Sequence, residues 1–149
     1  MKEIHVSING NDVTGLGSLD NPFRNIQYAL NYVEPGSTVI IHNGVYEPFV
    51  INKEASGTKE NKVIIKSADN EQATIQGIHG EFSITVHMVN VENITIDGLE
   101  IIGGGLGIYC ISDNSIGNKT LENITITNCI VHAYEDKEGI IKVRATLLN

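Results

Sequence analysis

The chain has 149 residues, a length that suits one domain, and its formal net charge of −8 argues against nucleic-acid binding, which needs clustered lysine and arginine at the phosphates. No apolar run is long enough to cross a bilayer, so we expect no membrane partner. Aromatic residues make up only 5% and tryptophan is absent. A core of small β-branched side chains on pleated backbone is therefore expected.

The localisation stays open on sequence grounds. No secretory signal follows Met1. The chain is then cytoplasmic when made, or the mature part of an exported protein, or a virion component released by lysis. Its two cysteines, Cys110 and Cys129, are too few for a disulfide framework, and each stands where an inward-facing residue is expected. We expect two buried thiols.

The N-terminal segment begins with turn chemistry and continues with the one convincing helix signal. Residues 9–23, NGNDVTGLGSLDNPF, are crowded with Gly, Asn, Asp and Pro. Asn21 can cap a helix and Pro22 suits its first position, so we predict a helix over 22–33, ended by Pro35-Gly36. Its apolar stripe consists of Phe23, Ile26, Leu30 and Val33.

From residue 38 onward the sequence predicts short strands separated by Gly, Asn, Asp and Glu. The predicted strands are VIIH (39–42), VIIK (63–66), ATIQG (73–77), SITVH (83–87), NITIDGLEI (93–101), GIYCI (107–111), NITITNCIV (123–131) and IIKV (140–143). Two-residue Asn-Gly or Asp-Gly hairpin turns are almost absent, which disfavours an antiparallel meander. No helical crossover follows residue 36, which excludes a doubly wound α/β sheet.

The pentapeptide ENITI occurs at 92–96 and again at 122–126, an offset of 30 residues. Self-similarity at such spacings is typical of a solenoid, in which each turn lays its strands on those of the turn before. Smaller offsets relate Ile65 to Val86 and Val86 to Cys110. We therefore predict an all-β fold, a parallel β-helix of about four or five turns. Chance similarity between strands of a β-sandwich is the alternative.

The single predicted domain spans residues 1–149, with an N-terminal cap over 1–37 and coils over 38–149. Alternation along the strands fixes which side chains fill the coil. The expected inward residues are Ile94, Ile96, Leu99 and Ile101, and in the next turn Ile124, Ile126, Cys129 and Val131.

Several short segments carry a likeness to a known family. They are Asn9-Gly10-Asn11-Asp12, Asn21-Pro22-Phe23 before the helix, Pro35-Gly36 before a Val/Ile strand, Asn43-Gly44-Val45-Tyr46, SGT at 56–58 and NITIDGLEI. Together they resemble the N-terminal cap and first turns of right-handed parallel β-helix proteins of the pectate-lyase-like superfamily. The resemblance implies that the coil is right-handed and that the helix plugs its N-terminal end, which would protect exposed strand edges.

For function the resemblance is broad. Members include polysaccharide lyases, glycosidases, epimerases, surface adhesins and phage tail-spike domains, and none of the matching residues is a catalytic signature. Enzymes of the superfamily usually have many more turns, whereas this sequence stops after a strand with no visible closing cap. We expect the last turn to end bare, to self-associate with another subunit, or to continue in a longer β-helix of which this chain is the N-terminal part.

Alternation also predicts one outward strip of basic and aromatic side chains. Its members are His42, Lys66, His87, Lys142 and Arg144, with Tyr109 in the intervening turn. Such a strip suits a carboxylated sugar and offers a base for β-elimination. We assign Lys66 and His87 as catalytic candidates and the other four as substrate-binding candidates. The alternative is that long polar side chains merely suit a solvated sheet face.

Calcium is the cofactor that the resemblance implies for lyases, but we predict no metal site, because the acidic residues Asp97, Asp113, Glu135 and Asp136 are dispersed. Glycoside hydrolysis needs a carboxylate pair across the bond. The outward ladder at Asp97 is expected to have Gln76 below and Thr127 above, which gives no such pair.

An outward column of Thr74, Thr95 and Thr125 is expected to be structural. We therefore predict a carbohydrate-engaging module that resembles polysaccharide lyases acting on uronate-containing polysaccharide. If it is an enzyme, β-elimination is favoured over glycoside hydrolysis. The alternative is a non-enzymatic structural or adhesin module of a phage or cell-surface assembly.

Overall fold

The computed structural model describes residues 2–80, 82–112 and 121–132, and the backbone of 141–144. Its strands form three parallel sheets. Sheet A contains β1 (Glu3–Val6), β2 (Thr38–Ile41), β5 (Val63–Ser67), β8 (Glu92–Asp97) and β11 (Glu122–Thr127). Sheet B contains β3 (Gly44–Tyr46), β6 (Ala73–Gln76), β9 (Glu100–Ile102) and β12 (Ile130–His132). Sheet C contains β4 (Phe49–Ile51), β7 (Ile84–Val89), β10 (Leu106–Ile111) and β13 (Ile141–Arg144).

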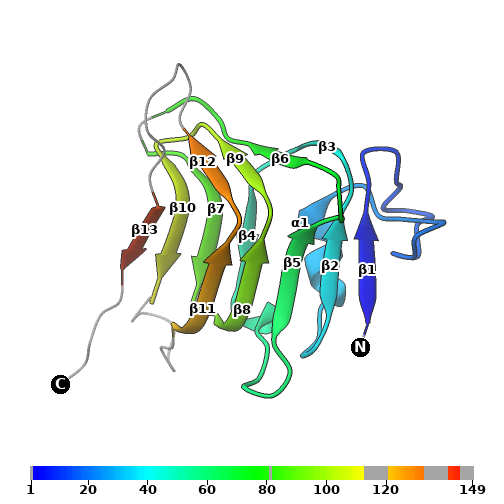
Figure 1. Ribbon diagram of the computed structural model, residues 1–149, viewed down its shortest axis with the longest axis horizontal. Helices are drawn as coiled ribbons and strands as arrows, with labels where there is room; N and C mark the ends of the chain where they lie inside the picture. Colours follow the sequence, from blue (N-terminus) through cyan, green and yellow to red (C-terminus); the bar gives the residue numbers. More distant parts are fainter. Residues whose placement is uncertain (1, 81, 113–120, 133–140, 145–149) are drawn as a thin grey trace.

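After β1 the chain visits sheets A, B and C in turn, and the described strands make four such coils stacked side by side (Figure 1). The predicted parallel β-helix is confirmed, and so is the predicted number of turns. The segment expected to act only as a cap also supplies β1, which extends sheet A beyond the first coil. Among the described residues no helix has the length and apolarity needed to cross a membrane.

The repeated pentapeptide forms β8 and β11, which pair in register, Ile94 with Ile124 and Ile96 with Ile126. The predicted inward residues of the earlier turn are fully buried: Ile94, Ile96, Leu99 and Ile101. Those of the later turn are partly buried and pack against the same core: Ile124, Ile126, Cys129 and Val131. The alternation rule therefore placed the inner face correctly.

Both cysteines carry free thiols on this inner face, as expected. Cys110 is fully buried, and burial raises the pKa of its thiol to about 11. Cys129 is half-buried, and burial is also the main cause that raises its pKa. Both thiols therefore stay protonated and unreactive near neutral pH.

The N-terminal helix is shorter than predicted. It consists of α1 (Ile26–Ala29) followed by the 3₁₀ turn η1 (Leu30–Tyr32). Phe23, expected in the first helical turn, instead forms an isolated parallel bridge with Val6. The start of the helix is organised by Asp12, whose carboxylate accepts hydrogen bonds from the backbone N–H groups of Arg24 and Asn25. The expected Asn21 cap is therefore wrong.

The cap covers two strand edges. Along β1, the N–H of His5 donates to the carbonyl of Gly17, and the N–H of Ser7 donates to that of Phe23. At the edge of sheet C, the Gln27 carboxamide makes both hydrogen bonds that a neighbouring strand would make with Val50, at 2.8 and 3.1 Å. These contacts satisfy backbone groups that would otherwise offer an open edge for pairing.

Candidate functional site

The six predicted site residues do not form one strip. Four of them lie on sheet C: His87 on β7, Tyr109 on β10, and Lys142 and Arg144 on β13. Lys66 lies on β5 of sheet A, and His42 directly follows β2 of the same sheet. The expectation of a single face is wrong.

The error has a clear geometric cause. Ile65 on β5 was equated with Val86 on β7, but these strands belong to different sheets of one coil. The true partner of Ile65 in the next coil is Ile96, and that of Val86 is Ile108. Strands of neighbouring sheets look alike in sequence, because each alternates aliphatic inward residues with polar outward ones.

Some of the predicted site residues nevertheless fall in one register row on sheet C. The parallel register aligns Val50, His87, Tyr109 and Lys142 on successive strands, and it pairs Ile111 with Arg144. The rings of His87 and Tyr109 are stacked, with centroids 5.4 Å apart and planes 20° apart. We call this row, His87, Tyr109 and Lys142, the sheet C row.

His87 of this row is half-buried. Burial lowers the pKa of His87, so the ring is neutral near neutral pH. Its Nε2 atom is buried and has no hydrogen-bond partner among the described residues. No described residue therefore fixes the protonation of this nitrogen by a hydrogen bond.

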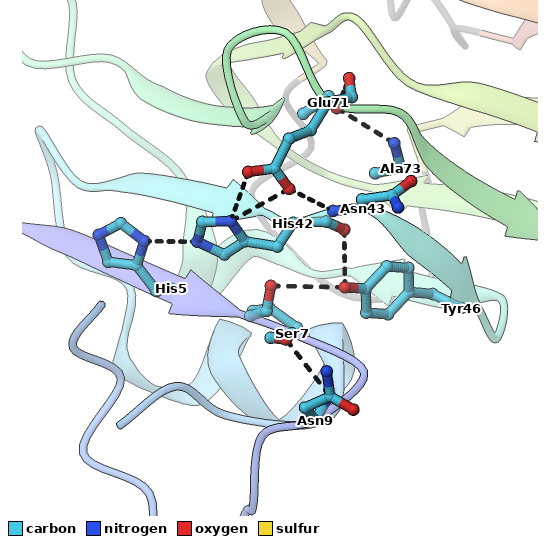
Figure 2. A network of polar contacts seen from close by, with 10 residues as sticks. His5, Ser7, Asn9, His42, Asn43, Tyr46, Glu71 and Ala73 are labelled. Atoms are coloured by element: carbon cyan, nitrogen blue, oxygen red, sulfur yellow. Dashed lines mark hydrogen bonds and ion pairs between the residues drawn. The ribbon is translucent and has the colours of Figure 1, made fainter. Parts of the chain in front are cut away.

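His42 belongs to a different assembly, at the corner between sheets A and B (Figure 2). Its Nδ1 lies 3.1 and 3.3 Å from the two carboxylate oxygens of Glu71, and its Nε2 lies 3.0 Å from Nδ1 of His5. The Asn43 N–H donates to the same carboxylate at 2.6 Å. We call His5, His42 and Glu71 the histidine network.

Hydrogen bonds from Tyr46 and from the backbone of Asn43 fix the histidine network in place. The Tyr46 hydroxyl donates to the His42 carbonyl at 2.8 Å, and burial raises the pKa of Tyr46 to about 12, so it remains a donor. The pKa of Glu71 is lowered, first by the Asn43 N–H and then by His42, so the carboxylate stays ionised. His5 and Glu71 were not predicted from the sequence, because their contacts with His42 form only when β1, β2 and β5 of sheet A are stacked.

Lys66 is engaged by a neighbouring acid. Its Nζ lies 2.6 Å from the Asp69 carboxylate, and this hydrogen bond is the main cause that raises the pKa of Lys66. In the next coil Asp97 lies in register with Lys66, and Thr127 follows on β11. The expectation that Gln76 lies below Asp97 is wrong, because Gln76 is on β6 of sheet B.

Sheet B carries a polar group that sequence reasoning also missed. Glu100 on β9 accepts a hydrogen bond from the Thr74 hydroxyl at 2.7 Å, and Nε2 of His132 lies 3.1 Å away from its other oxygen. These contacts lower the pKa of Glu100, Thr74 being the larger cause. The predicted threonine column therefore holds only for Thr95 and Thr125, which pair in register on sheet A.

A calcium ion needs several oxygen ligands that converge on one point. Among the described side chains no three His, Cys, Asp or Glu residues converge as a metal ion requires. Asp97 is instead bound by the Asn128 amide at 2.8 Å. Asp113, Glu135 and Asp136 lie outside the described residues. The described residues therefore do not fit a calcium site.

No protein-family model matches the chain. Pectate lyase PEL9 of Emericella nidulans is 26% identical over 140 residues, which cover 85% of this chain and 33% of that protein. Among solved structures, a lacto-N-biosidase from Eubacterium ramulus superposes with a TM-score of 0.71 at 25% identity, over 93% of this chain and 27% of that one.

Pectate lyase Pel9A superposes with a TM-score of 0.64 at 18% identity, over 89% of this chain and 38% of that chain. The chain spans about a third or less of the length of the curated relatives it matches: 33% of PEL9 and 26% of the protein YwoF of Bacillus subtilis. The parallel sheets and stacked coils of the structure agree with these likenesses. The chain is therefore a right-handed parallel β-helix protein with the pectate-lyase-like fold.

Proposed function

We propose that the chain is a carbohydrate-engaging β-helix module and that the outer face of sheet C contacts a uronate-containing polysaccharide. The observation that carries this proposal is the sheet C row, in which an aromatic pair is followed in register by a lysine, with Arg144 on the same strand. A sugar ring packs on an aromatic surface, and its carboxylate needs a cation nearby. The register of β10 and β13 supports this reading, because it pairs position 142 with Tyr109.

The spacing of the row also suits a polymer. Strands in a sheet are about 4.8 Å apart, so His87, Tyr109 and Lys142 follow one another at about that interval. An extended polysaccharide running across the coils would therefore meet successive members of the row. Two proteins similar to this chain bear the name pectate lyase, which supports a uronate polymer as the ligand class.

If the module cleaves its ligand, we assign the proton-accepting role in β-elimination to His87. A general base must be unprotonated at the working pH. Burial lowers the pKa of His87, whereas the hydrogen bond with Asp69 raises that of Lys66 and keeps it protonated. Lys66 also lies on another sheet, so it cannot act with the sheet C row on one bond.

The test combines binding with product formation. Polygalacturonate and a neutral galactan are offered to the chain, with and without Ca²⁺, and the ultraviolet absorbance of unsaturated product is followed beside affinity electrophoresis. We expect any retardation by galactan to be the same in wild type and Tyr109→Ala, and retardation by polygalacturonate to depend on the sheet C row. Tyr109→Ala should raise the Kd for polygalacturonate about tenfold, while Thr95→Ala on sheet A should leave this Kd unchanged.

The same experiment distinguishes binding of the polysaccharide from its cleavage. Product that disappears in His87→Asn, with retardation kept, supports β-elimination. Retardation without product from any polymer supports the non-enzymatic adhesin alternative. Equal retardation of wild type and Tyr109→Ala, with both folded by circular dichroism, would refute sheet C as the contact face.

A further inference from the structure

A concavity of about 580 Å³ lies at the corner where the chain passes from sheet C to sheet A. Two further concavities of the described residues are smaller, at about 250 and 280 Å³. Its volume falls within the roughly 300–1,000 Å³ that small-molecule sites occupy. The lining residues are Gly57, Thr58, Lys59, Glu92, Asn93, Glu122 and Asn123.

One wall is the segment before β5, which folds back onto the start of β8. The Gly57 N–H donates to the Glu92 carbonyl at 3.0 Å, and the Glu92 N–H donates to the Ser56 hydroxyl at 3.0 Å. A Cβ on Gly57 would lie 2.6 Å from the Asn93 carbonyl oxygen, so only glycine permits this approach. The wall is therefore fixed before any ligand arrives.

The floor is built by the asparagine of the repeated pentapeptide. Asn93 and Asn123 both adopt a left-handed backbone with φ of 54°, a conformation that asparagine tolerates better than most residues. The Asn123 amide donates to Oδ1 of Asn93 at 2.7 Å, and Lys62 donates to Oδ1 of Asn123 at 3.1 Å. These contacts stack one coil on the next and hold the two asparagines in place.

The side chains that line the concavity favour a ligand that carries hydroxyl groups. Glu92 and Glu122 are in register on adjacent strands, and Lys59 and Thr58 line the same concavity. Ionised carboxylates accept strong hydrogen bonds from hydroxyl donors. The lining contains no apolar or aromatic side chain, which disfavours a hydrophobic ligand. Two glutamates against one lysine also disfavour an anionic ligand.

We propose that this concavity binds a neutral, hydroxyl-rich saccharide, with Glu122 and Lys59 as its principal contacts. This site is separate from the sheet C row in place and in ligand charge, so either proposal can fail alone. A module with both would hold an acidic polymer on one face and a neutral sugar, such as a side chain or a second glycan, at the neighbouring corner.

The experiment is a titration of the ¹⁵N-labelled full chain followed by NMR. The probes are neutral galacto- and xylo-oligosaccharides and, separately, oligogalacturonate. We expect saturable shifts of the amides of Gly57, Asn93 and Asn123 with a neutral probe only. Glu122→Ala should raise its Kd about tenfold, whereas Glu60→Ala, on the same loop but outside the lining, should leave it unchanged.

Three results would overturn the proposal. The first is the absence of saturable shifts at this corner with either neutral probe. The second is an unchanged Kd in both Glu122→Ala and Glu122→Gln. The third is a response to Ca²⁺ alone, together with loss of the saccharide shifts in EDTA, which would make the corner a cation site. Shifts confined to His87 and Tyr109 would support the sheet C row and count against this site.

Discussion

The imidazoles of His5 and His42 are joined directly, with Nδ1 of His5 3.0 Å from Nε2 of His42 (Figure 2). Since Nδ1 of His42 faces the Glu71 carboxylate, it carries a proton. The pair can then share one further proton between the facing nitrogens. Two fully protonated rings would oppose N–H to N–H, so the contact requires at least one neutral imidazole.

This relationship gives the fold a dependence on pH. Burial and the charge of His42 lower the pKa of His5 below 6.5, against a smaller opposing effect of Glu3, whose carboxylate lies 3.8 Å from Nε2. The unfolded chain then binds more protons than the folded chain just below pH 6.5. The free energy of unfolding should therefore fall as the pH drops through this value, as urea denaturation at several pH values can measure.

His87 should also make the free energy of unfolding fall as the pH drops below 6.5, because burial lowers its pKa as well. The variants His5→Asn and His87→Asn should each remove part of this pH dependence, and the double variant should remove more than either. A free energy of unfolding that is flat or rises on acidification through this window would contradict the neutral assignment of both rings.

Glu71 should stabilise the corner between sheets A and B. Glu71→Ala removes the acceptor of the Asn43 N–H and of His42, which we expect to cost about 1 kcal/mol at neutral pH, because the side chain is part exposed. The lowered pKa of Glu71 makes this contribution present above pH 4.5 and lost as the pH falls further. Urea midpoints measure it, and Glu60→Ala serves as the exposed control.

The asparagine of the pentapeptide should be needed for both its backbone and its side chain. Asn93→Ala places alanine, which tolerates a left-handed backbone less well than asparagine, at φ of 54° and deletes the bond with Asn123. We expect the free energy of unfolding to fall by about 2–3 kcal/mol. Asn93→Gly keeps the backbone freedom and should cost less. Thermal unfolding separates the two variants, and equal losses would contradict a role for the left-handed backbone.

Side chains on the two faces of the coil should respond very differently to truncation. Ile96→Ala removes a fully buried side chain and should cost about 2–5 kcal/mol. Ile130→Ala changes a side chain that is 57% exposed and should cost less than about 1 kcal/mol. Similar losses for both in urea denaturation would place Ile96 outside the core.

The sequence was most informative about the inside of the coil. The strict alternation of Ile94 and Ile96, repeated in Ile124 and Ile126, reflects the geometry of each strand and needs no knowledge of its neighbours. The grouping of the outward side chains was harder to predict, because it depends on which strands stack in one sheet. Unequal turns between the sheets made β5 and β7 look equivalent, and this placed Lys66 with His87.

Two other misses arise from contacts between distant segments. The helix start was misplaced because Phe23 pairs with Val6, a backbone contact that outweighs its fit to the helical stripe. His5 was treated as part of a cap, although its role depends on the stacking of β1 on β2. Side chains whose partners come from other coils cannot be paired from local periodicity alone.

The central claim is that a uronate polymer lies across the outer face of sheet C. A crystal structure of the chain with an oligogalacturonate tests it most directly. The account predicts that a sugar ring packs over the His87–Tyr109 pair and that its carboxylate points toward β13. An oligosaccharide bound across sheet A or sheet B, with the sheet C row untouched, would contradict it.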